Sequence, residues 1–245
     1  MRETQRVEPE RLSRPVVLQR PGTAAPGRAG SPPTSTAILA PPPHWGYSPL
    51  KRAVDVAGAA VLLAALSPLF LALAALICLD SRGPAIYRQQ RAGYRGRPFR
   101  CYKFRTMRDG ADSLLARDPG LRAEFAARWK LERDPRVTRV GRWLRRTSLD
   151  ELPQLFNVLR GEMSLVGPRP VQPDELRRQF GPYAAAVTSV KPGLTGLWQV
   201  SGRSALPYRE RVRLELEYVR RRSLPYDVAI LLRTVPAVLS GRGAA

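Results

Sequence analysis

The sequence predicts a mainly helical α+β protein that carries one membrane helix and a small β element. Three observations support this fold class. Residues 56–79 form an uncharged, almost entirely apolar run. A basic stretch at 88–108 interleaves aromatic residues in a partly alternating pattern typical of short strands. Later segments place apolar or basic residues at helical intervals. The chain accordingly divides into a tail at 1–47, a membrane helix at 48–80, a basic mixed domain at 81–223, and a C-terminal amphipathic helix and tail at 224–245.

Composition excludes several kinds of active site. The 245 residues include one histidine, His44, and two cysteines, Cys78 and Cys101. A lone histidine in a proline-rich stretch does not support a histidine-based triad, and two cysteines make neither a thiolate zinc site nor a disulfide framework. The net charge is +21, from 41 Lys and Arg against 20 Asp and Glu. Such a chain needs anionic neighbours, which can be nucleic acid, lipid headgroups or phosphorylated substrates.

The first 47 residues contain nine prolines among Gly, Ser, Thr and Arg, without apolar periodicity. A segment of this composition buries too little apolar surface to offset the entropy lost on ordering, so we expect a disordered tail. It contains no early hydrophobic stretch of signal-peptide type. Export through a cleaved signal is therefore not expected.

Residues 56–79 predict a membrane segment. As a helix with a rise of about 1.5 Å per residue, this run covers roughly 36 Å, enough to cross a hydrocarbon core of about 30 Å. Ser67 and Pro68 lie at its centre, and an interior proline kinks a helix. Lys51 precedes the run and Arg82 follows it, so both ends favour the cytoplasmic side. On these grounds a bent helix that dips in and returns, and a kinked helix that crosses, both remain open.

The region after the membrane segment is expected to combine a hairpin with helices. Residues 88–108 predict the hairpin, and residues 117–130 predict a helix of mixed charge. Arginines recur between 136 and 146 at a spacing that would align several on one helical face. Residues 206–222 predict a basic amphipathic helix. Residues 226–239 are mostly apolar but too few to span a bilayer, so they either lie in the membrane interface or pack as a core helix.

The stretch 147–170 contains the most informative acidic pair. Ser148 precedes Glu151 by three residues, the spacing of a capping box, and apolar residues follow at helical intervals. Asp150 and Glu151 would then lie at a helix start, although Pro153 fits better if the helix begins one or two residues later. Exposed amides and nearby arginines favour ionised carboxylates there. An ionised aspartate can attack phosphorus and its neighbour can hold a metal; alternatively, both acids only cap a helix.

Two further stretches favour phosphate binding. Residues 167–170 hold Arg169 between two prolines, which leaves its backbone little entropy to lose on meeting a phosphate. Residues 191–203 form a Gly-rich, polar and cationic segment that can cradle a diphosphate. Neither stretch matches the phosphate loop of ATPases or a dinucleotide fingerprint, and glycines also occur in ordinary turns.

Four features in this order resemble the bacterial sugar transferases, or monotopic phosphoglycosyl transferases. They are Lys51-Arg52 before the apolar run with Ser67-Pro68 at its centre, the segment KFRTM at 103–107, the block SLDELPQLFNVLRGEMSLVGPRP at 148–170, and KPGLTGLWQVSGR at 191–203. The resemblance covers about residues 50–242. It implies a re-entrant helix bent at Ser67-Pro68, which supports the dipping alternative, and a catalytic domain on the cytoplasmic face of the bacterial inner membrane.

The resemblance also implies an activity. Family members move a sugar 1-phosphate from a UDP-sugar to undecaprenyl or another polyprenyl phosphate, release UMP and require Mg²⁺, in the first membrane step of exopolysaccharide, capsule, O-antigen or glycoprotein glycan assembly. Asp150 would be the nucleophile that forms a covalent phosphosugar, with Glu151 beside it and both as Mg²⁺ ligands. The phosphate-binding groups that carry over are Lys103, Arg145, Arg169 and Arg203, with Arg105 and Lys191 as secondary candidates that can equally be structural.

Two other classes of function also account for parts of the sequence. A membrane-tethered nucleic-acid-binding protein would explain the charge, but no nucleic-acid-binding motif is recognisable. A non-catalytic scaffold for polysaccharide assembly would keep the fold, but the intact acidic pair and its basic companions argue against it. We therefore expect a UDP-sugar, undecaprenyl phosphate and membrane lipids as partners, and no nucleic acid. The sugar is not specified by any motif, and a homo-oligomer remains open.

Overall fold

A computed structural model describes residues 48–128, 131, 134–241 and 243. The tail predicted at 1–47 lies outside the described residues. The described chain is mainly helical, with one long apolar helix and two small sheets, as the predicted fold class requires. Its principal elements are α1 (Pro49–Asp80), β1 (Ile86–Ala92), β2 (Pro98–Phe104), α2 (Ala111–Arg117), α3 (Pro119–Arg128), α4 (Arg139–Thr147), α5 (Gln154–Arg160), β3 (Ser164–Val166), α6 (Pro173–Glu175), α7 (Ala184–Val187), β4 (Gly193–Thr195), α8 (Leu197–Ser201), α9 (Tyr208–Arg221) and α10 (Leu224–Ser240).

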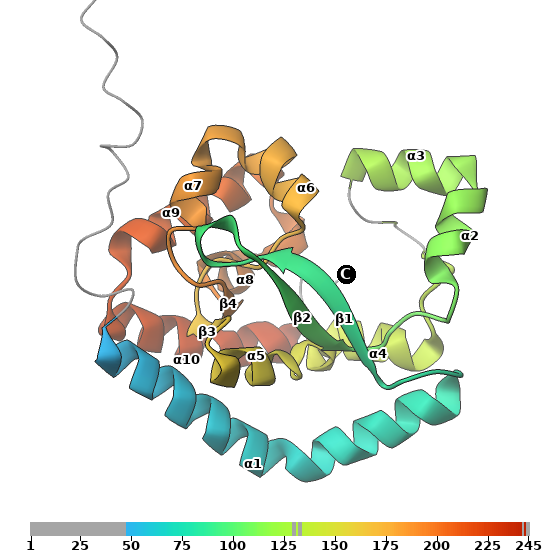
Figure 1. Ribbon diagram of the computed structural model, residues 1–245, viewed down its shortest axis with the longest axis horizontal. Helices are drawn as coiled ribbons and strands as arrows, with labels where there is room; N and C mark the ends of the chain where they lie inside the picture. The colour runs from blue at the N-terminus through green and yellow to red at the C-terminus, as the bar shows by residue number, and fades with distance from the viewer. Residues whose placement is uncertain (1–47, 129–130, 132–133, 242, 244–245) are drawn as a thin grey trace, which may run out of the picture.

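Helix α1 is bent near its middle (Figure 1). The Ser48 side chain caps its start by accepting a hydrogen bond from the Lys51 amide at 3.1 Å. Pro68 lies inside the helix, and the preceding Ser67 hydroxyl donates to the Ala64 carbonyl at 2.8 Å. Proline removes one helical hydrogen bond and clashes with the preceding turn, which accounts for the bend. Within the described chain, α1 is the one helix long and apolar enough to cross a membrane.

Both arms of α1 pack against the same domain. In the first arm, Ala59 joins the main hydrophobic core together with Leu165 of β3. In the second arm, Ile77 packs in a separate cluster with Phe104 of β2 and Leu144 of α4. Figure 1 shows α1 running along one side of the domain, next to α5 and α4. The two halves of the apolar helix therefore attach to one body.

Strands β1 and β2 form the predicted hairpin. They pair antiparallel in a register that places Tyr87 opposite Lys103. The buried side chain of Asn157 on α5 fixes the outer edge of β2, because it accepts from the Tyr102 amide at 3.0 Å and donates to the Arg100 carbonyl at 2.8 Å. The second sheet, the parallel pair β3 and β4, was not predicted. Strands of three residues are too short to display a periodic pattern.

Helices α9 and α10, near the C-terminus, pack against the main hydrophobic core. Helix α9 is the amphipathic helix predicted at 206–222, and its apolar face is buried. Helix α10 packs against the core through Ile230, as the core-helix alternative for 226–239 requires, while other apolar side chains are exposed. These exposed side chains recur at helical spacing as Val228, Leu232, Val235 and Leu239.

Candidate active site

The acidic pair lies on a tight turn between α4 and α5. Asp150 and Glu151 belong to the 3₁₀ turn Leu149–Glu151, and α5 begins only at Gln154. The helix therefore begins even later than the one or two residues that Pro153 led us to expect, and Pro153 is its N-cap rather than a residue of its first turn. The capping-box prediction is wrong: Ser148 has a left-handed backbone, with φ of 58°, and its side chain caps neither helix. An N-cap typically has an extended backbone, whereas Ser148 is the left-handed C-cap of α4.

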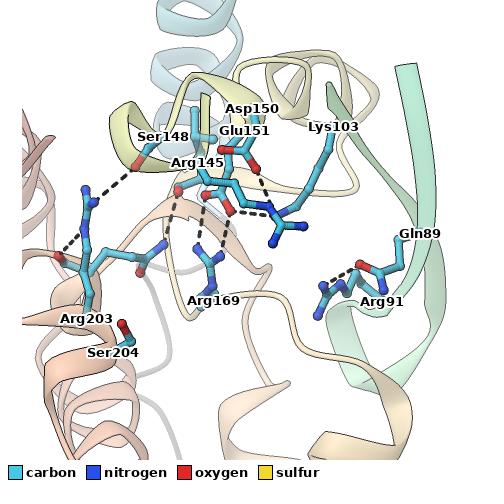
Figure 2. Close-up of polar contacts among 12 residues, drawn as sticks. Gln89, Arg91, Lys103, Arg145, Ser148, Asp150, Glu151, Arg169, Arg203 and Ser204 are labelled. Atoms are coloured by element: carbon cyan, nitrogen blue, oxygen red, sulfur yellow. Dashed lines mark hydrogen bonds and ion pairs between the residues drawn. The ribbon is translucent and has the colours of Figure 1, made fainter. Parts of the chain in front are cut away.

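Glu151 is held by two cations from different parts of the chain (Figure 2). Its Oε1 lies 2.7 Å from Nζ of Lys103 on β2, and also 2.7 Å from Nη2 of Arg169, which follows β3. Nη1 of Arg169 donates to Oε2 at 3.1 Å. Burial alone would raise the pKa of Glu151, but the charges and hydrogen bonds of Arg169 and Lys103 hold it well below its usual range. Glu151 therefore stays ionised and fixes the two cations in place.

Asp150 is buried without such partners. Its side chain accepts no hydrogen bond from any residue the structure describes, and its Oδ2 lies 4.0 Å from Nζ of Lys103. Burial raises the pKa of Asp150 to about 6; Lys103 opposes this rise and Glu151 adds to it. At neutral pH the carboxyl is thus mainly ionised but poorly solvated, a combination that favours nucleophilic attack.

The loop that carries Arg169 is fixed by Glu215, a residue that was not predicted from the sequence. Glu215 of α9 is fully buried, and its Oε1 accepts a hydrogen bond from the Arg169 amide at 3.1 Å. Burial raises the pKa of Glu215 to about 7. The available signal was an acid inside the apolar face of a predicted amphipathic helix, where a buried carboxyl needs a partner.

Arg145 and Arg203 reach the same turn from two other directions. The Arg145 side chain on α4 extends toward the acidic pair (Figure 2), and its Nε donates to the Thr106 hydroxyl at 2.9 Å. Burial lowers the pKa of Arg145, and the Asp150 carboxylate partly restores it. Arg203 donates from Nη1 to the Ser148 hydroxyl at 3.1 Å. Four of the six basic candidates thus surround the turn.

The two secondary candidates lie elsewhere. Arg105 donates to the carbonyls of Ser81 at 2.7 Å and Gly83 at 3.0 Å, so it binds the backbone at the end of α1. Residues two apart in a strand point to the same face, so Arg105 would follow Lys103 toward the acidic pair if β2 continued. The strand ends at Phe104, and Arg105 points elsewhere. Lys191 lines a cavity at the start of α1 together with Arg52. Neither side chain forms an ion pair with Asp150 or Glu151 among the described residues.

The acidic pair fits Mg²⁺ only together with a substrate. No group of three or more His, Cys, Asp or Glu side chains suited to a metal occurs in the part of the chain that is described. Glu151 accepts three hydrogen bonds from Lys103 and Arg169, which leaves one acceptor position on its Oε2, whereas Asp150 accepts none from the described residues. Mg²⁺ is commonly held by one or two carboxylates, several waters and substrate phosphates, and this donor set matches that pattern.

The whole arrangement suits chemistry at a phosphate or diphosphate. Asp150 accepts no hydrogen bond from the described residues, and the charges of Lys103, Arg145 and Arg169 act on it. Arg203 adds a fourth cation at Ser148, in the same turn. Preorganised cations can cancel the charge of a phosphorylated substrate, which would otherwise repel the attacking carboxylate.

Comparison with known proteins agrees with this chemistry. An undecaprenyl-phosphate galactose phosphotransferase of Salmonella typhimurium is 49% identical over 199 residues, which cover 80% of this chain but 41% of that protein. The exopolysaccharide production protein ExoY of Rhizobium meliloti is 47% identical, with 79% and 87% covered. An undecaprenyl-phosphate glucose phosphotransferase of Komagataeibacter xylinus is 44% identical, with 79% and 36% covered. Residues 46–241 match the model of the family described as bacterial sugar transferase, and the chain belongs to that family.

Proposed function

We propose that this protein transfers a sugar 1-phosphate from a UDP-sugar to undecaprenyl phosphate and releases UMP. Family membership and the names of the galactose and glucose phosphotransferase relatives support this reaction class. The observation that carries the proposal is the difference between the binding partners of the two acidic side chains. Glu151 binds the cations Lys103 and Arg169, whereas Asp150 is buried beside them without a hydrogen bond from the described residues.

In the first step, an Asp150 carboxylate oxygen attacks the phosphorus that carries the sugar. A new bond forms between this oxygen and phosphorus, and the bond from phosphorus to the oxygen shared with the α-phosphate breaks. UMP leaves with that electron pair, and the sugar phosphate remains on Asp150 as an acyl phosphate. A general base is not required, because the nucleophile is already an anion.

In the second step, a phosphate oxygen of undecaprenyl phosphate attacks the same phosphorus. The bond to Asp150 breaks, the carboxylate is regenerated, and the sugar leaves on a lipid-linked diphosphate. Lys103 and Arg169 lie against Glu151 at 2.7 Å, within reach of the charge that develops in both steps. Arg145 and Arg203 add positive charge around the turn that carries Asp150.

We also propose that Mg²⁺ binds with the donor substrate at Asp150 and Glu151. When bound, the ion supplies charge neutralisation on the diphosphate. The protein residues contribute carboxylate oxygens, chiefly those of Asp150, because the Glu151 oxygens already accept from cations. Removal of divalent ions with EDTA should abolish turnover, and added Mg²⁺ should restore it.

The bend in α1 supports a re-entrant path at the cytoplasmic face of the inner membrane. A helix that crossed the bilayer would separate its two ends, whereas both arms of α1 contact one domain (Figure 1). Apolar side chains are exposed on α1, such as Val61 and Leu71, and on the neighbouring α5 and α10, such as Phe156 and Leu232. An active site held at the membrane surface can reach both a soluble nucleotide sugar and the phosphate of a lipid.

A UMP-release assay over a panel of UDP-sugars, including UDP-glucose and UDP-galactose, tests the proposal. We expect UMP release in amounts matched by lipid-linked product when undecaprenyl phosphate is present. Salt-sensitive DNA binding without UMP release would favour the nucleic-acid alternative. Neither UMP release nor DNA binding, over the whole panel, would favour the scaffold.

A further inference from the structure

A second cationic cluster surrounds a cavity of about 160 Å³ at the start of α1. None of its lining residues forms an ion pair or a hydrogen bond with Asp150 or Glu151 in the described chain. The charged lining residues are Lys51, Arg52, Asp55, Lys191 and Arg222. The cavity is thus separate from the candidate active site, and the proposed reaction assigns it no role.

Part of this charge is balanced inside the protein. Nζ of Lys51 lies 2.9 Å from Asp55 and 2.7 Å from Asp227. Asp55 also accepts hydrogen bonds from the Ser164 hydroxyl and the Leu165 amide, both at 3.1 Å. This network ties α1 to β3 and α10. The two aspartates oppose four cations around the cavity, namely Lys51, Arg52, Lys191 and Arg222, so a net positive charge remains.

Among the described residues, Arg52 and Lys191 form no ion pair with either aspartate. Arg52 donates to the carbonyls of Val158 at 2.6 Å and Leu159 at 2.8 Å, which fixes its position at the end of α5 but leaves its positive charge. Lys191 forms no hydrogen bond or ion pair with any residue that the structure describes. An unpaired ammonium group beside a guanidinium is costly when both are partly removed from water.

The charged groups of Arg52 and Lys191 both lie next to Gly161. A Cβ atom built on Gly161, the left-handed residue after α5, would lie 3.4 Å from Nη2 of Arg52 and 3.6 Å from Nζ of Lys191. Burial, and then the Arg52 charge, lower the pKa of Lys191, and the Asp55 charge opposes this shift only in part. The capped N-terminus of α1 adds positive potential, because Ser48 and Lys51 of its first turn line the same cavity. A bound anion would relieve this concentration of positive charge.

The position of the cavity indicates which anion is available. It lies at the start of the apolar helix, where basic residues that flank a membrane segment meet lipid headgroups. We propose that Arg52 and Lys191 bind the phosphate of an anionic phospholipid in this cavity. The inference depends on the membrane location of α1 but not on the chemistry at Asp150.

The test is native mass spectrometry of the full-length protein in detergent, titrated with phosphatidylglycerol or phosphatidylcholine at elevated salt. Partly buried charges are screened less than exposed ones, so the wild type should retain one phosphatidylglycerol per chain and little phosphatidylcholine. Lys191→Met should weaken phosphatidylglycerol binding roughly fivefold, and Lys191→Arg should restore it. The matched control is Arg82→Met, which removes the same charge from an exposed position beyond the other end of α1 and should leave the retained lipid unchanged.

Two outcomes would overturn the proposal: equal lipid retention by Lys191→Met and wild type, or an equal loss in Arg82→Met. Displacement of the lipid by millimolar inorganic phosphate would also overturn it, because the site would then serve a soluble anion. Unchanged melting temperatures for both Lys191 variants would exclude unfolding as the cause of a loss. Asp150→Asn should retain the lipid fully, so failure of this proposal and failure of the proposed reaction are distinguishable.

Discussion

Two regions of the molecule bury carboxylates beside a lysine, and they treat those carboxylates differently. At the start of α1, Asp55 accepts hydrogen bonds from Lys51, Ser164 and Leu165. At the turn between α4 and α5, Asp150 is also buried, but Lys103 lies 4.0 Å away and no hydrogen bond from a described residue reaches it. A carboxylate that accepts several hydrogen bonds stabilises the fold, whereas one that accepts none is available to react. The comparison therefore predicts opposite consequences for removing the two acids.

The largest effect is expected for Asp150→Asn. Loss of the nucleophile should lower the rate of UMP release by about 10⁴-fold or more. The melting temperature at pH 8 should stay the same or rise, because burial raises the Asp150 pKa and the ionised form is therefore unfavourable in the folded state. A variant that kept the wild-type rate would remove Asp150 from its assigned role.

For Asp55→Asn we expect the opposite pattern, a loss of stability with little loss of rate. The substitution weakens a network that joins Lys51, Ser164 and the Leu165 amide, so it should destabilise the protein by about 3 kcal/mol. The rate per folded molecule should be nearly unchanged, since Asp55 does not contact the acidic pair. Thermal unfolding in detergent, combined with UMP release at a temperature below the transition, separates the two quantities. A stable variant with a large loss of rate would contradict the assignment of a structural role to Asp55.

Lys103→Met tests the electrostatics of the reactive carboxylate. The rate should fall by about 10²-fold, because a cation that offsets developing charge is lost. With an Asp150 pKa of about 6, the wild-type kcat/KM should rise with pH through that value and then level off. Lys103 lowers this pKa, so its removal should move the rising limb to higher pH. A pH–rate profile with an unshifted limb would show that this limb does not report the Asp150 carboxylate.

The smallest effect is expected at Glu215. Glu215→Ala leaves the part-buried Arg169 amide without its protein acceptor, so the KM for the UDP-sugar should rise about tenfold. Glu215→Gln keeps an oxygen acceptor and should remain within about threefold of wild type. Steady-state kinetics on both variants provide the measurement. Equal losses in the two variants would indicate that the charge of Glu215, rather than its hydrogen bond, supports the site.

Local patterns predicted the parts of the fold whose determinants lie close together in sequence. The apolar helix and the hairpin each follow from composition or spacing within a few residues. Family resemblance grouped Lys103 and Arg169 with Glu151, although 48 residues separate Lys103 from Glu151.

The sequence marked Lys191 only as a secondary candidate and did not place it beside Arg52, because Arg52 is distant along the chain and only tertiary packing brings the two together. Glu215 was missed for the same reason, since its partner is a backbone amide on a remote loop. The left-handed Ser148 was unpredictable from its residue type, because serine at capping-box spacing normally has an extended backbone.

The most direct test is the intact mass of the protein after incubation with the preferred UDP-sugar and Mg²⁺ in the absence of a lipid acceptor. Wild type and the Asp55→Asn variant should each gain one sugar phosphate, and peptide mapping should locate it on Asp150. Addition of undecaprenyl phosphate should then discharge the adduct into lipid product. Lipid product formed by Asp150→Asn, or an adduct mapped to any other residue, would contradict the account.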